Sequence, residues 1–373
     1  MGFLDQRAGL QWVQDNIAAF GGSPAKVTIF GESAGAWSVD ALLTSYPAHS
    51  DPPFRAAILQ SGQVSYSAYP RPHLPSAWAS LSAALHCPGS HATDLACVRA
   101  APATEIQRII DEQRLTFNPI PDNITLVSNP AARRLSGEIA HVPVLAGSNS
   151  QEGSVFTLGQ NDTNAFLTNI LGLGTDAIAA VEAAYAIGSP GIESAHDQIN
   201  AIFTEGVFTC SEAAWAHASA SIGIPTWRYL FNASFPNTQP YPNLGAYHSS
   251  EIYLAFGTYP RDDATTQEVA LSTAMMSAWG RFAKNPMDGP GWDSVRTGEA
   301  GQVLFGTNDY DVGGWYAGSQ GNALNGSKDL ALLGNTGSEA GNGVTLIAQQ
   351  EVDYRCGLWT PVYEAVGELF NGL

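Results

Sequence analysis

The feature that most constrains this chain is a short β-branched and aromatic run, Val27–Phe30, that leads into the pentapeptide Gly31-Glu-Ser33-Ala-Gly35. A helix-like stretch over residues 34–43 follows directly. This order of strand, Gly-x-Ser-x-Gly turn and helix predicts a nucleophile elbow, which exposes the serine hydroxyl above a sheet. We therefore expect Ser33 to be a nucleophile. We also expect both flanking glycines to avoid a clash between a Cβ atom and the neighbouring strand or helix.

The rest of the chain alternates strand-like and helix-like segments, which predicts an α/β fold with a mostly parallel sheet flanked by helices. Buried strands are predicted at residues 55–61, 142–147 and 226–231. Helical patterns lie at about 76–86, 99–113, 164–186, 195–222, 266–284 and 357–371. Residues 299–343 are rich in Gly, Asn and Asp, and we expect a long surface excursion without chemistry there.

Composition narrows the possible partners. The 373 residues are 45% apolar, enough for a large core, and contain no apolar run long enough for a transmembrane helix. A net charge of −18 argues against a nucleic-acid partner, because no basic stripe is available to neutralise phosphates.

The four cysteines do not have the spacing of metal ligands, and no metal or organic cofactor is expected. Cys87 and Cys97 bracket a short Pro/Gly/Ser-rich loop that a disulfide could close, although four buried free thiols are an alternative. Four glycosylation sequons agree with an oxidising, extracellular setting: Asn123, Asn161, Asn232 and Asn325.

The first residues read as an amphipathic helix in which Leu10, Val13 and Ile17 share a face, and no signal peptide precedes it. An oxidised, secreted protein without a leader is inconsistent. We therefore expect that the true N-terminus, with its signal peptide, lies upstream of Met1.

Partners for Ser33 can be sought by topology, because α/β-hydrolases place them in the chain order Ser, Asp or Glu, then His. Glu152 is the first carboxylate after the strand at 142–147, with a solvated loop glutamate as the alternative. Three histidines follow it, and His196 and His217 lie in helical stretches. His248 lies in a loop, where an imidazole could reach both the serine and the acid.

These segments resemble the type-B carboxylesterase/lipase family, which includes cholinesterases and secreted fungal lipases. The likeness rests on residues 2–35, GSNSQEGSVF, LGAYHSSEIYLAFG, ILQSG and RCGLW, and covers nearly the whole chain. It implies an α/β-hydrolase fold, with residues 1–373 as the C-terminal portion of a single domain. It also implies Ser33 as nucleophile, Glu152 as acid and His248 as general base.

Further residues follow from the same resemblance. Glu32 and Glu251 resemble a buried glutamate pair near the family's site, and Ser61 resembles a serine that hydrogen-bonds the acid. Phe117 matches an aromatic residue of the acyl pocket. Disulfides are implied between Cys87 and Cys97 and between Cys210 and Cys356.

The family's early strands and its His-Gly-Gly-Gly oxyanion loop have no counterpart here, so of the oxyanion donors we expect only the backbone N–H of Ala34. The resemblance implies hydrolysis of a small-molecule or lipid ester through an acyl-enzyme. An inactive fragment, a non-catalytic binding homologue and a serine peptidase on the same fold remain alternatives.

Overall fold

The computed structural model describes residues 2–66, 75–87, 91–295, 329–334 and 342–371. The chain divides into two compact units. The first consists of Met1–Tyr69 and Asp122–Leu373, and the second of Pro70–Pro121.

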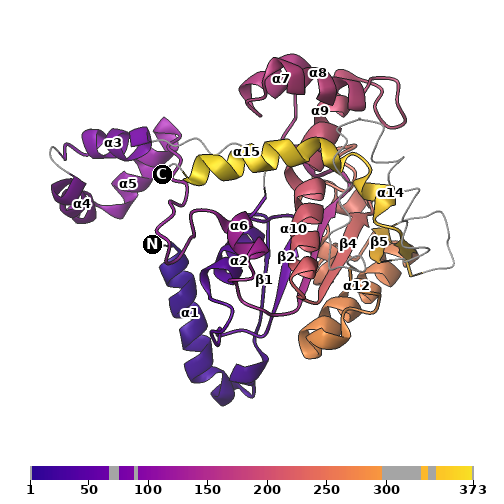
Figure 1. The fold of residues 1–373 in the computed structure, drawn as a ribbon, viewed down its shortest axis with the longest axis horizontal. Coiled ribbons are helices and arrows are strands. Elements are labelled where there is room, and N and C mark those ends of the chain that lie inside the picture. Colours follow the sequence, from indigo (N-terminus) through magenta and orange to yellow (C-terminus); the bar gives the residue numbers. More distant parts are fainter. Residues whose placement is uncertain (1, 67–74, 88–90, 296–328, 335–341, 372–373) are drawn as a thin grey trace. The chain divides into compact units, whose positions relative to one another are not determined.

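A six-stranded sheet forms the centre of the first unit, with its strands side by side in chain order (Figure 1). The first four are parallel neighbours: β1 (Thr28–Glu32), β2 (Ala56–Gln60), β3 (Val144–Asn149) and β4 (Thr226–Asn232). Strand β5 (Leu330–Gly334) continues the parallel order, and β6 (Val344–Ile347) pairs with it antiparallel. The three strands predicted at 55–61, 142–147 and 226–231 are confirmed as β2, β3 and β4. The predicted α/β architecture with a mostly parallel sheet is likewise confirmed.

Helices cover the sheet and extend the unit beyond it (Figure 1). Its α-helices are α1 (Gly2–Asn16), α2 (Ala34–Ser45), α6 (Pro130–Leu135), α7 (Thr163–Asn169), α8 (Thr175–Ala184), α9 (Ala195–Phe203), α10 (Cys210–Ser221), α11 (Ile252–Ala255), α12 (Thr266–Lys284), α14 (Gln350–Asp353) and α15 (Thr360–Asn371). Short 3₁₀ helices are η1 (Ile17–Phe20), η2 (Pro24–Lys26), η3 (Glu152–Val155), η5 (Pro236–Thr238), η6 (Pro286–Asp288) and η7 (Cys356–Trp359), and η4 (Thr204–Thr209) is a π-helix.

The core has two layers because successive side chains of a strand point to opposite faces of the sheet. On one face, Trp227, Tyr229 and Phe231 of β4 pack against α12. On the other face, α2 and α10 cover β2 and β3. Both faces are therefore buried along β2, β3 and most of β4, which is why these strands read as nearly continuous apolar runs, whereas Phe30 of the edge strand β1 is 56% exposed.

Three expectations about secondary structure need correction. Of residues 299–343, the structure describes 329–334 and 342–343, and the surface excursion expected there is wrong for β5, whose Leu330 and Leu333 are almost fully buried. The short apolar run was obscured by the Gly- and Asn-rich composition around it. The helix expected at 164–186 is two helices with a break at Gly172, which has a positive φ of 68°. The helix expected at 195–222 is interrupted by the π-helix η4.

The sequon at Asn325 lies outside the described residues.

The second unit has three α-helices among its described residues: α3 (Pro75–Ala84), α4 (His91–Ala100) and α5 (Ala103–Gln113). Leu81, Val98 and Ile109 form its small core. A disulfide joins Cys87 to Cys97, and the segment between them is partly helical rather than a simple loop, because α4 begins at His91.

Candidate active site

Ser33 occupies the single residue between β1 and α2, in strained backbone geometry. Its φ of 55° and ψ of −119° lie outside the regions that non-glycine residues favour. A Cβ on Gly31 would come within 2.3 Å of the Gly35 carbonyl carbon, so this glycine is required for the turn. The same expectation for Gly35 is wrong in the described structure, where an added Cβ meets no atom within 4 Å.

Glu152 and His248 form a buried pair beyond the carboxyl ends of β3 and β4. His248 Nδ1 lies 2.6 Å from Glu152 Oε2, and Glu152 is fully buried. A carboxylate can only accept, so Nδ1 carries the proton and donates it. The other oxygen of Glu152 accepts a 2.6 Å hydrogen bond from the backbone N–H of Asn149. These bonds fix the tautomer of the imidazole and hold the ring at its Nδ1 edge.

The second ring nitrogen of His248 has no hydrogen-bond partner in the described structure. It lies 3.2 Å from Glu32 Oε1, but Nε2 of a neutral ring with its proton on Nδ1 is an acceptor, as is the carboxylate. Glu32 directly precedes Ser33, so the imidazole reaches the serine turn. No hydrogen bond joins the Ser33 hydroxyl to His248 among the described residues.

The charges around His248 raise the pKa of its imidazole. Burial lowers the pKa of His248, but the hydrogen bond and charge of Glu152, with the charges of Glu32 and Glu251, outweigh it and raise the pKa above its usual value. Burial also raises the pKa of Glu32, against the opposing effects of His248 and of a 2.6 Å hydrogen bond donated by Ser249.

Glu251, three residues after His248, is fully buried. Its carboxylate accepts hydrogen bonds from Gln60 Nε2 at 2.9 Å and Asn149 Nδ2 at 2.7 Å. Burial, followed by the charge of Glu152, raises its pKa to about 7. Sequence reasoning missed Gln60 and Asn149. Their one signal was a polar residue at the end of a buried parallel strand, where the sites of α/β folds gather.

The remaining predicted site residues differ in their outcome. Ser61 has a φ of 55° and is buried, but its hydroxyl has no hydrogen-bond partner in the described structure, so the expected bond to the acid is absent. Glu152 is satisfied instead by Asn149 and His248. Ala34 begins α2, where the first N–H groups of a helix have no partner within that helix. Phe117 belongs to the second unit, and its acyl-pocket role stays a prediction.

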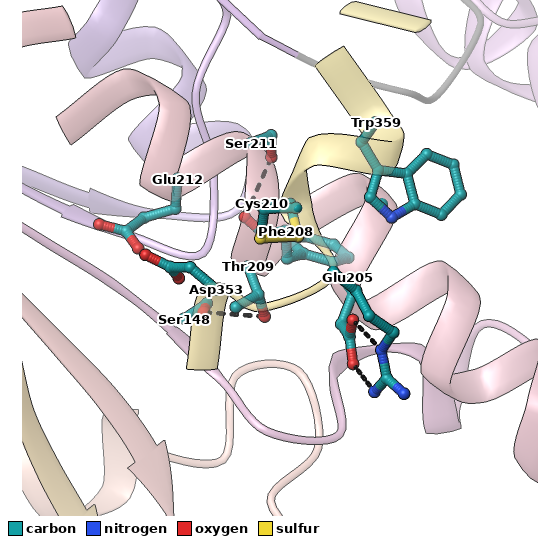
Figure 2. The surroundings of a disulfide bond; sticks show 12 residues. Ser148, Glu205, Phe208, Thr209, Cys210, Ser211, Glu212, Asp353 and Trp359 are labelled. Atoms are coloured by element: carbon teal, nitrogen blue, oxygen red, sulfur yellow. Dashed lines mark hydrogen bonds and ion pairs between the residues drawn. A yellow bond between two sulfur atoms is a disulfide. The ribbon is translucent and has the colours of Figure 1, made fainter. Parts of the chain in front are cut away.

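Both disulfides implied by the resemblance are present. Besides Cys87–Cys97, a disulfide joins Cys210 at the start of α10 to Cys356 at the start of η7 (Figure 2). No group of three or more His, Cys, Asp and Glu residues in the described part of the chain could hold a metal ion. Nor does any helix described here have the length and apolarity to cross a membrane.

A mostly parallel sheet with a strained serine between a strand and a helix places the protein in the α/β-hydrolase class. Residues 1–311 match the model of the carboxylesterase family, and the chain belongs to that family. It is 31% identical to secreted lipase 5 of Gibberella zeae, over 78% of this chain and 54% of that protein. It is 29% identical to chlorogenic acid esterase of Aspergillus niger, over 95% of this chain and 62% of that protein.

The para-nitrobenzyl esterase of Bacillus subtilis is 31% identical, over 76% of this chain and 58% of that protein. The chain thus spans between 54% and 62% of the length of these relatives. The family resemblance expected from the sequence motifs is confirmed.

Proposed function

We propose that the protein is a serine carboxylic-ester hydrolase that works through an acyl-enzyme. The observation that carries the proposal is the buried 2.6 Å pair of Glu152 and His248, whose other ring nitrogen has no hydrogen-bond partner in the described structure and lies beside the strained turn of Ser33. Backbone strain at a non-glycine residue is typical of functional positions. A serine nucleophile is activated by an adjacent base, and that base is in turn oriented by an acid.

In the proposed mechanism, His248 Nε2 takes the proton of the Ser33 hydroxyl as Oγ bonds to the ester carbonyl carbon. The imidazolium that forms is stabilised by Glu152, and the Ala34 N–H at the start of α2 faces the oxyanion. The C–O bond to the alcohol then breaks, and the alcohol leaves with the proton held by His248. Water, deprotonated by His248, then attacks the acyl carbon, the bond from that carbon to Ser33 Oγ breaks, and His248 returns the proton to Oγ as the acid leaves. The bond from Ser33 to His248 forms in the substrate complex, where such bonds commonly tighten.

The substrate class we propose is a small-molecule or lipid ester. Relatives named as lipases, a chlorogenic acid esterase and a para-nitrobenzyl esterase support this range. We also propose an extracellular location, because the structure contains two disulfides and relatives include proteins named as secreted.

A fluorophosphonate probe tests the assignment directly, because it labels only an activated serine. We expect its mass on the peptide that contains Ser33, together with hydrolysis of a short-chain nitrophenyl ester. Ser33→Ala should remove both signals, and Ser38→Ala, one turn into α2, is the matched control that retains both. Labelling of another serine, or hydrolysis that survives Ser33→Ala, would contradict the proposal. A folded protein without either signal would favour a non-catalytic binding role.

A further inference from the structure

Two aromatic rings contact the imidazole of His248. The ring centroids of Phe208 and His248 are 4.9 Å apart, and those of Phe156 and His248 are 5.0 Å apart. Phe208 and Phe156 also stack on each other at 6.0 Å. Phe156 is half exposed, whereas Phe208 is 92% buried, so Phe208 is the contact that the protein interior holds in place.

Phe208 lies in the π-helix η4, which joins α9 to α10 without a break in the chain. Short π-helical turns inside α-helices occur frequently at functional sites. The same turn also supports the acid of the site. Thr204 Oγ1 accepts a 2.9 Å hydrogen bond from the backbone N–H of Gly153, the residue after Glu152. One helical turn therefore contacts both the His248 ring and the Glu152 loop.

Residues 355–363, called the C-terminal segment below, contact η4 at several points (Figure 2). Arg355 forms an ion pair with Glu205, and its Nε donates at 2.9 Å. Tyr363 donates a 2.8 Å hydrogen bond to the Gly206 carbonyl. The Cys356–Cys210 disulfide fixes the residue that follows η4.

Trp359 explains why position 206 is a glycine. A Cβ there would lie 2.7 Å from the Trp359 ring, so the ring packs directly on the backbone of η4. The contacts made by residues 355–363 on either side of Phe208 leave this turn little freedom to shift.

We propose that Phe208 is a positioning residue for His248, and that the C-terminal segment holds it in place through η4. This inference rests on the role of His248 in the proposed function. Glu152 fixes one edge of the imidazole, at Nδ1, which leaves the ring free to tilt about that bond. The buried ring of Phe208 limits this tilt and excludes water from the imidazole, so that Nε2 stays directed at the serine turn.

The first test compares three variants by two readouts, kcat on a nitrophenyl ester and the pKa of His248 followed by NMR of histidine-labelled protein. Phe208→Ala should lower kcat by roughly 10- to 100-fold with KM within about threefold, because a misplaced base costs rate rather than binding. It should also raise the His248 pKa, because water admitted to the ring stabilises the cation. Phe208→Leu, which keeps an apolar wall, should restore most of both.

Phe166→Ala is the control, since Phe166 is buried in the same apolar cluster as Phe208 but its ring contacts Phe203, at 6.0 Å between centroids, and not His248. It should leave both readouts unchanged. Unaltered kcat and pKa in Phe208→Ala would overturn the inference. The NMR titration does not depend on hydrolysis. A wild-type protein without Ser33-dependent turnover would therefore refute the proposed function, while the pKa change would still test the contact.

The second test removes contacts between the C-terminal segment and η4 while leaving Phe208 unchanged. The double variant Cys210→Ser/Cys356→Ser should shift kcat and the His248 pKa in the same directions as Phe208→Ala, by a smaller amount. Arg355→Gln and Tyr363→Phe remove the side-chain contacts while leaving the disulfide intact, and serve if the double variant does not fold. The double variant Cys87→Ser/Cys97→Ser should leave the His248 pKa unchanged. Folded variants of the C-terminal segment with wild-type values in both readouts would refute this part.

Discussion

His217 and His248 are both about 92% buried, yet their surroundings drive their pKa values in opposite directions. Burial, reinforced by the charge of Arg228, lowers the pKa of His217 to about 4. Around His248 the glutamates outweigh burial and raise the pKa. Burial alone therefore does not decide whether an imidazole in this fold can take up a proton; the sign of the neighbouring charge does.

The carboxylates around the two histidines differ in the same way. Near His217, Arg228 forms ion pairs with Glu212 at 2.8 Å and Asp353 at 2.6 Å, so a cation offsets the buried negative charge. Near His248, the charges that act most strongly on Glu251 are two other glutamates, and its pKa rises to about 7. The first cluster joins β4 to α10 and α14, whereas in the second the neighbouring carboxylates raise the pKa values of both Glu251 and His248.

The largest expected difference between the surroundings of His248 and those of His217 is in the kcat that remains when each imidazole is removed. His248→Ala should lower kcat by about 10⁴- to 10⁶-fold, the range seen when a base of a catalytic triad is lost. His217→Ala should leave the kcat of the folded protein within about twofold, because His217 touches no proposed reacting group. Initial rates on a nitrophenyl ester, normalised to folded protein, measure both. Comparable losses in the two variants would break the distinction between the clusters.

Removing the cation of the first cluster should destabilise the fold. Arg228→Met leaves Glu212 and Asp353 buried without their partner, which typically costs about 3–5 kcal/mol of unfolding free energy. It should also raise the pKa of His217, since the charge of Arg228 lowers it. Urea unfolding and NMR titration measure the two effects. Arg108→Gln, at an exposed ion pair, is the control and should change neither. An Arg228 variant as stable as wild type would show that the cluster does not hold these elements together.

The parts of the molecule that sequence predicted are those whose signals are local. The turn at Ser33 was predictable because strand, turn and helix are adjacent in the chain, and the loop of His248 was recognisable by its turn-forming residues. Glu152 lies three residues after the end of β3 and was recognisable as the first carboxylate beyond that strand; its role as the acid stays a prediction. Chain order then sufficed to propose these three residues as partners.

The misses depend on contacts between distant segments. Gln60 and Asn149 act on Glu251 across about 190 and 100 residues of sequence, and neither belongs to a motif. Phe208 looks like an ordinary core residue of a helix, because the π-turn that aims it at His248 follows from tertiary packing. Strand β5 was missed because its partners, β4 and β6, are needed to recognise it.

Replacing Glu251 by a neutral residue should change how the unfolding free energy depends on pH. The folded protein keeps the Glu251 proton up to a pH of about 7, whereas the unfolded chain loses it above a pH of roughly 4.3. Because the folded protein holds this proton more tightly than the unfolded chain, Glu251 makes the fold less stable as pH rises between these values. The unfolding free energy of wild type minus that of Glu251→Gln should fall by about 3 kcal/mol across this window. Denaturant unfolding at several pH values measures it, with the exposed Glu138→Gln as control. A difference independent of pH would contradict the raised pKa.

The smallest effect concerns Glu32, which raises the pKa of His248 by its charge but ranks behind Glu152 in doing so. The base must be neutral, so kcat/KM should rise through a pKa above the usual ~6.5 and level off on the alkaline side. Glu32→Gln retains an acceptor for the Ser249 hydroxyl while removing the charge 3.2 Å from Nε2, so this acid limb should move down by about half a pH unit. Profiles from pH 5 to 9 measure the shift, with Glu138→Gln as the matched control. An acid limb that stays in place, or moves up, would mean that the carboxylate beside Ser33 does not act on the imidazole, leaving the raised pKa to Glu152 and Glu251.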